Sequence, residues 1–240
     1  RNGFTQTHNI AFSGGSERGT MRVSITRQDH RPVIDNSNYD RTTINLGANL
    51  KISDKLRADL SLSYINYNRL NSPTLGDEWD RSFNKGYLYS WPRSYKGLDR
   101  EYYANPDGSR NPQEGYPFQY VSPYLWWNYY NNNTTLSRDK YLGAITLTYD
   151  ILPWLNLLGR AGRDFSLEQY ESRNKPTDLI GIQDGYYANS LNRTYSDIFE
   201  LFLTADKADL FGSKLDVKFT LGTSRWDYNQ YGINGHSGTW

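Results

Sequence analysis

The sequence predicts an all-β protein, a transmembrane antiparallel up-and-down β-barrel with about eight strands in this chain. Apolar and polar residues alternate one by one over eight segments, as in strands with one apolar and one polar face. The connections between these segments alternate between short and long. The chain is 15% aromatic although its mean hydropathy is only −0.81. A membrane barrel reconciles these values, because only alternate strand residues meet lipid and long polar loops lower the average.

The clearest alternation runs from residue 41 to residue 67, in "RTTINLGANLKISDKLRADLSLSYINY". Apolar positions recur every second residue on both sides of a short break at 53–55, which predicts two strands joined by a turn. The same pattern appears at 7–14 and 20–28, where the glycine-rich stretch "GGSERG" separates the two segments. Glycine tolerates the backbone angles of tight turns, so these four segments predict two hairpins.

The second half of the chain repeats this arrangement at 140–150, 155–165, 193–206 and 214–224. Pro153 lies in the turn between the first two segments, because proline cannot donate a hydrogen bond to a central strand. No alternation is visible after Ser224, so a loop-like stretch is expected there. The predicted short turns are 14–19, 53–55, 150–154 and 207–213, and the long connections are 29–40, 66–138 and 166–192.

Alternating loop lengths are typical of outer-membrane barrels, whose short turns are periplasmic and whose long loops are extracellular. A soluble glycan-binding β-sandwich is the alternative, but it has no reason to sort its loops in this way. We therefore expect one face to meet lipid and the other to line a lumen. The residues expected to face lipid are Thr42, Ile44, Leu46, Leu50, Leu60, Leu62, Val217 and Phe219. The residues expected to face the lumen are Asn45, Asn49, Asp59, Ser61, Asp216 and Lys218. Tyr64, Tyr141, Tyr149 and Trp154 are expected at the membrane interface, which favours Tyr and Trp.

Bulk composition excludes several functions. The net charge is +1, which predicts no nucleic-acid partner. The chain has no cysteine, so disulfides, thiol catalysis and thiolate metal sites are excluded. No run approaches the roughly 18 apolar residues that a membrane helix needs. The first residues lack the layout of a signal peptide, so an export signal is expected outside this chain.

Several segments together resemble SusC-like (SusC/RagA) TonB-dependent outer-membrane transporters. The matching motifs are His8-Asn9 before the first strand's centre, Ser13 to Glu17 at the hairpin, and Asn38-Tyr39-Asp40-Arg41 before a long strand. The resemblance covers about residues 5–225. It implies that residues 1–240 are a partial barrel domain, about a third of a 22-stranded barrel, from its earlier half after the plug. The plug domain and the TonB box match nothing in this chain.

The resemblance also implies a function and partners. The implied function is TonB-dependent import of oligosaccharides or peptides across the outer membrane of a Gram-negative bacterium. The implied partner is a SusD-like surface lipoprotein that caps the barrel. TonB would act through the missing N-terminal part. A structural barrel that serves as scaffold for a multi-protein complex in the outer membrane is the alternative, and the barrel sequence alone does not separate the two.

The long connection at 66–138 holds 11 of the 21 Tyr, four of the seven Trp and six of the nine Pro. A loop of this length is usually functional, and rigid aromatic side chains suit ligand stacking or a partner interface. The same residues could instead fill a small core of the loop itself. The candidate contact residues are Trp79, Trp91, Tyr120, Trp126, Trp127, Tyr129 and Tyr130.

No motif predicts an enzyme, a metal site or a cofactor. The acidic cluster "GDEWD" places Asp77, Glu78 and Asp80 beside Trp79, but it lies in a loop without a partner spacing that glycoside hydrolysis would need. "NPDGSRN" lacks the distal acidic ligand of an EF-hand and is ordinary turn chemistry. The three histidines have no paired metal-binding spacing.

Overall fold

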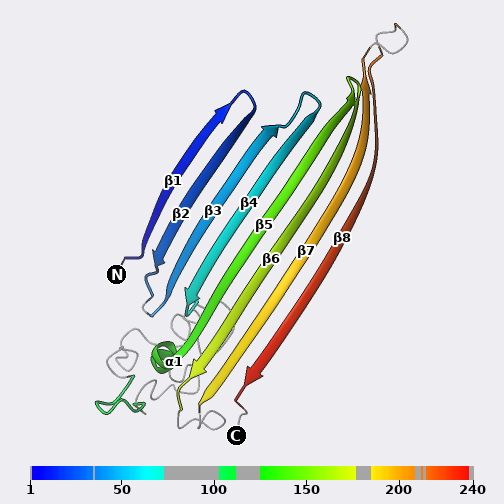
Figure 1. The fold of residues 1–240 in the computed structure, drawn as a ribbon. Helices are drawn as coiled ribbons and strands as arrows, with labels where there is room; N and C mark the ends of the chain where they lie inside the picture. The colour runs from blue at the N-terminus through cyan, green and yellow to red at the C-terminus, as the bar shows by residue number, and fades with distance from the viewer. Residues whose placement is uncertain are drawn as a thin grey trace.

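The computed structural model describes residues 2–34, 36–72, 103–111, 125–176, 185–208, 212 and 215–237. Eight strands form one antiparallel sheet in which each strand pairs with the next along the chain (Figure 1). The strands are β1 (Phe4–Ser16), β2 (Gly19–Arg31), β3 (Asn38–Lys51), β4 (Leu56–Leu70), β5 (Asn132–Leu152), β6 (Leu155–Asn174), β7 (Tyr186–Lys207) and β8 (Val217–His236). One short helix, α1 (Leu125–Asn131), precedes β5. The predicted all-β, up-and-down topology is confirmed.

The two ends of the sheet differ as the sequence predicts. The tight hairpins β1–β2, β3–β4 and β5–β6 lie at one end, and α1 lies at the other (Figure 1). The β3–β4 turn is closed by the Ser53 hydroxyl, which accepts hydrogen bonds from the amides of Lys55 (3.3 Å) and Leu56 (3.1 Å). Serine competes for backbone donors in this way at turns, which ends the strand ladder.

The strands are longer than the alternation predicts. The connection between β2 and β3 spans 32–37 rather than 29–40, that between β4 and β5 spans 71–131 rather than 66–138, and that between β6 and β7 spans 175–185 rather than 166–192. The prediction of a loop-like stretch after Ser224 is wrong, because β8 pairs with β7 from Val217 to His236. A strand that continues beyond an apolar band needs backbone hydrogen bonds but no alternation, so sequence periodicity ends before the ladder does.

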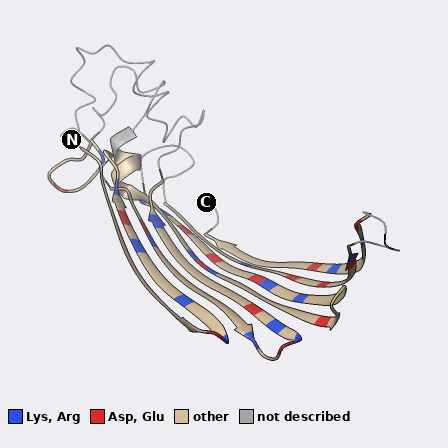
Figure 2. Ribbon diagram, turned by 90° about the horizontal axis from the view of Figure 1, so that it is seen from above, with Lys and Arg blue, Asp and Glu red and all other residues tan. Residues whose placement is uncertain are grey.

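The sheet is a single curved layer with charged residues along its strands (Figure 2). Among the described residues, only Ala58, Trp127 and Tyr129 are buried hydrophobic residues. Large apolar side chains remain uncovered on the sheet, for example Phe219, which is 62% exposed. A β-sandwich would cover such a face with a second sheet, and the described strands all belong to one sheet. The sandwich alternative is therefore wrong.

The sheet is open in the described part of the chain, since β1 and β8 each pair on one side only. Among the residues that the structure describes, no helix is both long and apolar enough to span a membrane.

We expect residues 1–240, expressed alone in the presence of lipid vesicles, to aggregate rather than insert. Two unpaired strand edges leave backbone groups that lipid cannot satisfy. The measurement is gel mobility with and without heating, together with sedimentation. A monomeric, heat-modifiable folded band from this fragment would contradict the expectation.

Candidate functional site

The register of the strands sorts their side chains into an apolar and a polar face. Residues paired across an antiparallel ladder point to the same side. Leu46 pairs with Leu62, and Leu60 in turn pairs with Ile145, so the apolar positions align from strand to strand. On the other face, Asn49 pairs with Asp59.

The predicted division of these residues between two opposite faces is therefore confirmed for the residues inside the ladder. Two refinements follow. Asp216 lies just before β8 and has no place in the ladder. Thr42 is on the apolar face, but its hydroxyl accepts a hydrogen bond from Arg27 (3.0 Å) and belongs to the polar border described next.

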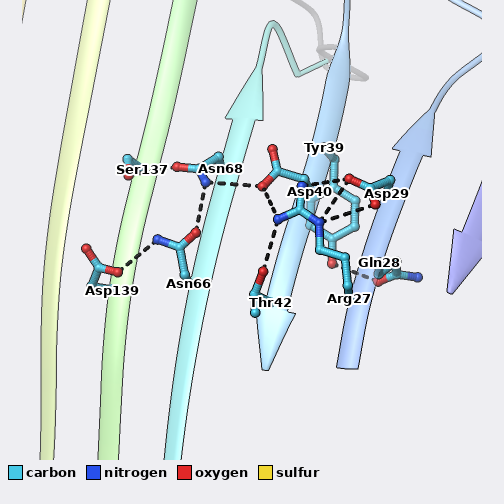
Figure 3. Close-up of polar contacts among 10 residues, drawn as sticks. All are labelled: Arg27, Gln28, Asp29, Tyr39, Asp40, Thr42, Asn66, Asn68, Ser137 and Asp139. Carbon is cyan, nitrogen blue, oxygen red and sulfur yellow. Dashed lines mark hydrogen bonds and ion pairs between the residues drawn. The ribbon is translucent and has the colours of Figure 1, made fainter. Parts of the chain in front are cut away.

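A continuous polar network bounds the apolar face toward the loop end of β2 to β5 (Figure 3). We call it the polar belt, and its residues are Arg27, Asp29, Asp40, Thr42, Asn66, Asn68, Ser137 and Asp139. The guanidinium of Arg27 binds Asp29 (2.7 Å) and Asp40 (3.1 Å). Asn68 continues the network by donating to Asp40 (3.2 Å).

The belt reaches β5 through Asn66, whose side chain donates to Asp139 (2.8 Å). The network links polar side chains of four strands, so the apolar face ends at this level in side-chain hydrogen bonds.

Tyrosines lie where the apolar face meets this belt. The rings of Tyr64 and Tyr141 are 4.8 Å apart, and the Tyr64 hydroxyl donates to Asp139 (2.6 Å). At the opposite end of the sheet, Tyr149 lies near the β5–β6 turn, and the Lys207 ammonium lies 6.0 Å from the centre of the Trp154 ring. Aromatic residues thus stand at both borders of the apolar face, which is the arrangement favoured at membrane interfaces.

The polar border follows directly paired residues from β2 to β5, and from β5 to β8 it steps toward the turn end of the sheet. On β5 the first charged residue of the apolar face is Asp139. On β6 it is Arg163, which pairs with Gly143, four residues nearer to the turn end than Asp139. On β8 the first charged residue is Arg225. It pairs with Phe199 of β7, which is two residues nearer to the turn end than Asp197 of the same strand.

Ion pairs neutralise these charges: Arg163 with Asp197 (2.5 Å) and Arg225 with Asp227 (2.7 Å). Barrel strands cross a membrane at a tilt of about 35–45°, so a border parallel to the membrane shifts along the paired residues of a sheet, as the border does from β5 to β8. The alternation within one strand does not reveal the shift of the border between strands, because the shift depends on how neighbouring strands are paired.

The opposite face is polar and largely neutralised by ion pairs between neighbouring strands. Three of these pairs are Arg57–Asp150 (3.2 Å), Lys140–Asp164 (2.9 Å) and Arg160–Glu200 (3.0 Å). Apolar residues interrupt it, among them Trp226, which is 67% exposed and donates its indole N–H to Ser196 (2.6 Å). A face with this composition suits water rather than lipid.

Three asparagines hold the root of the long connection, and we call them the asparagine clamp: Asn36, Asn71 and Asn133. The side chain of Asn71 donates to the Asn36 carbonyl (2.8 Å) and to Asn133 Oδ1 (2.8 Å), and its Oδ1 accepts the Thr134 amide (2.7 Å). Asn36 donates to the Tyr129 carbonyl (2.9 Å), which ties α1 to the clamp.

The backbone explains why asparagine occupies two of these positions. Asn36 has φ 51° and Asn71 has φ 47°, a region that asparagine tolerates better than most residues. The clamp thus joins the β2–β3 loop, the end of β4, α1 and the start of β5.

The candidate aromatic residues divide into three groups. Trp79, Trp91 and Tyr120 lie outside the described residues. Trp126 belongs to α1, but its side chain lies outside the described part. Trp127 (3% exposed) and Tyr129 (8%) are buried at the base of the connection. Tyr130 packs its ring 5.0 Å from that of Tyr103. Burial raises the pKa of Tyr129, so its hydroxyl stays protonated at neutral pH. The burial of Trp127 and Tyr129 favours packing within the protein over contact with a ligand or a partner at these two residues.

Among the described residues, no group of three or more His, Asp or Glu side chains could hold a metal ion. The segment "NPDGSRN" is a turn in which Asp107 accepts hydrogen bonds from the amide (2.9 Å) and hydroxyl (2.6 Å) of Ser109. These bonds lower the pKa of Asp107. The acidic cluster "GDEWD" lies outside the described residues.

No protein-family model matches the sequence, and no curated protein sequence matches it. Solved structures do. The chain is similar to the RagAB peptide transporter (TM-score 0.77) and to the RagAB peptide importer in its open-open state (0.77) and its closed-closed state (0.74). Each is 19% identical, over 97% of this chain and 25% of that chain, so this chain spans about a quarter of their length. The resemblance seen in the motifs is confirmed at the level of fold: strands β1 to β8 form a partial barrel sheet like that of the RagAB structures.

Proposed function

We propose that this chain is part of the wall of an outer-membrane barrel that imports nutrients into a Gram-negative bacterium. The observation that carries the proposal is the uncovered apolar face with its polar border and its aromatic residues at both ends. Such a face needs a lipid environment, since a soluble protein would expose it to water at a large free-energy cost. The fold shared with RagAB structures supports import as the role.

In this proposal the apolar face contacts lipid and the polar face lines the lumen. The short hairpins are periplasmic, and the polar belt and the asparagine clamp lie at the extracellular end. The barrel has 22 strands, and residues 1–240 supply eight of them from its earlier half. A plug domain and a TonB box precede them in the complete protein, and TonB supplies the energy for import.

The cargo is a peptide or an oligosaccharide. Peptide is favoured because the similar solved structures are described as a peptide importer. The barrel moves its cargo without making or breaking bonds, so it needs no catalytic residue or cofactor.

A SusD-like surface lipoprotein caps the extracellular mouth. The aromatic connection between β4 and β5 emerges at that mouth and supplies contacts to the lid or the cargo through Trp79, Trp91, Tyr120, Trp126 and Tyr130. Trp127 and Tyr129 are buried, and they support this surface from below.

Uptake in the source bacterium tests the proposal. Deletion of the gene for the complete protein should abolish accumulation of labelled peptides or oligosaccharides too large for porins, and the intact gene should restore it. Collapse of the proton-motive force should also stop uptake, because TonB coupling requires it. Undiminished uptake in the deletion strain, together with loss of an outer-membrane complex, would instead support the scaffold role.

A further inference from the structure

Two tyrosines and two arginines form a compact block on the polar face at the loop end of β3 and β4. Tyr39 pairs with Arg69, and Arg41 pairs with Tyr67, so the four side chains share one face. The tyrosines occupy one diagonal, with ring centres 5.1 Å apart, and the arginines occupy the other. We call these four residues the arginine–tyrosine block.

Neighbouring side chains fix the orientation of Tyr39, against whose ring Tyr67 packs. The Tyr39 hydroxyl donates to Gln28 Oε1 on β2 (3.1 Å). The ring of His30 meets the ring of Tyr39 edge-on at 6.4 Å, and His30 Nδ1 is hydrogen-bonded to the Thr5 hydroxyl (2.6 Å). An aromatic surface held in this way loses little conformational freedom when a ligand binds to it.

Among the described residues, the arginines of the block have no acidic partner, as is also true of Arg22 on this face, whereas other cations of the face are paired. Arg57, Lys140 and Arg160 each bind a carboxylate. Arg41 instead donates to the Thr43 hydroxyl (3.2 Å), and neither Arg41 nor Arg69 forms an ion pair with any described residue.

On the side of β5, Tyr67 pairs with Arg138, whose guanidinium binds Glu168, and on the side of β1 the surrounding surface offers no carboxylate. From the level of Arg22 to the loop end, the polar face of β1 to β4 carries Arg22, Arg41 and Arg69 but no Asp or Glu. The acids of this region, Asp29 and Asp40, lie on the opposite face, where Arg27 binds both. Charge is thus segregated across a single layer of sheet, and the polar face keeps an unneutralised positive charge.

We propose that the arginine–tyrosine block binds an extended acidic peptide through two carboxylates that are two residues apart. Diagonal positions on an antiparallel pair are about 7–8 Å apart. Alternate side chains of an extended peptide point to the same side and are about 7 Å apart at 3.3 Å per residue. Each guanidinium binds one carboxylate through its planar fork, and the tyrosine rings contact the peptide between them.

This inference rests on the proposed import function and deepens it, because it assigns a preference within the cargo. It requires only reversible binding. The preference is for Glu-x-Glu over Gln-x-Gln, and for Glu-x-Glu over adjacent glutamates, whose side chains point to opposite sides of an extended chain.

The experiment measures fluorescence anisotropy of labelled hexapeptides with the complete protein in detergent, and uptake of the same peptides by cells. The probes carry Glu-x-Glu, Gln-x-Gln or Glu-Glu at their centre. We expect Glu-x-Glu to bind about tenfold more tightly than Gln-x-Gln, with an advantage that shrinks as salt is raised. The double substitution Arg41→Gln with Arg69→Gln should remove this advantage, because it weakens binding of Glu-x-Glu about tenfold more than binding of Gln-x-Gln.

Arg22→Gln is the matched control. Arg22 lies on the same face of β2, pairs with Gly47 and has no ion pair with any described residue, but it is remote from the tyrosines. Its substitution should leave the preference intact. Equal binding of the three peptides, or equal losses in the double variant and in the Arg22 variant, would overturn the inference. If Gln-x-Gln is still imported in that case, the proposed function stands. If no peptide is bound or imported, both fail.

Discussion

Leu46→Arg should destabilise the complete barrel by about 2–4 kcal/mol in lipid vesicles, the cost of an arginine near the bilayer midplane. Leu46 lies in the interior of the apolar face, where it pairs with Val23 on one side and Leu62 on the other. The guanidinium would therefore have only apolar neighbours from β2 to β4. The measurement is the free energy of unfolding from urea titration of the folded barrel, compared with the unsubstituted protein.

Asn45→Arg is the control, one residue away on the polar face. Asn45 pairs with Ser24 and Ser63, and it accepts one hydrogen bond from the Ser63 hydroxyl (2.8 Å). Its replacement loses about 1 kcal/mol or less, since the bond is exposed and water can replace it. Equal costs for the two substitutions would show that the faces are wrongly assigned.

Asn71→Ala should weaken the root of the long connection by about 2–4 kcal/mol. The substitution removes three hydrogen bonds of a buried side chain and places alanine at φ 47°, which costs about 1–2 kcal/mol in the left-handed region. The sensitive observable is hydrogen exchange of the Thr134 amide, which donates to Asn71 Oδ1. Its protection should fall in the variant, while amides in the middle of β3 and β4 should keep theirs.

Two further substitutions separate the backbone from the side chain. Asn71→Gly places a residue that tolerates positive φ at this position and still removes all three side-chain hydrogen bonds. The protection of the Thr134 amide should therefore fall almost as far as in Asn71→Ala. Asn71→Asp keeps the Oδ1 acceptor for Thr134 but loses the donors to the Asn36 carbonyl and Asn133. Full protection of Thr134 in the glycine variant would show that the clamp does not hold the loop root.

Alternation was a reliable guide where a strand has two chemically different environments on its faces. It predicts the pairing of the segments at 42–52 and 56–64, the short turns and the tyrosines at the ends of the apolar face, because a one-residue slip would move every apolar residue of a strand to the polar face. Alternation does not predict the ends of the strands. Residues 225–236 of β8 and 166–174 of β6 pair fully without regular alternation, since beyond the apolar band each face mixes polar and apolar residues.

The sequence by itself determined the fold class, the number of strands, the two faces and the resemblance to SusC-like barrels, because these depend on a period of two within each strand and on short motifs. Only the tertiary structure revealed the shift of the polar border, the asparagine clamp and the arginine–tyrosine block. Each of these joins residues from different strands, such as Asn36 with Asn133 or Tyr39 with Arg69, and their proximity depends on register across the sheet. Register is a property of paired strands, and no single segment of sequence contains it.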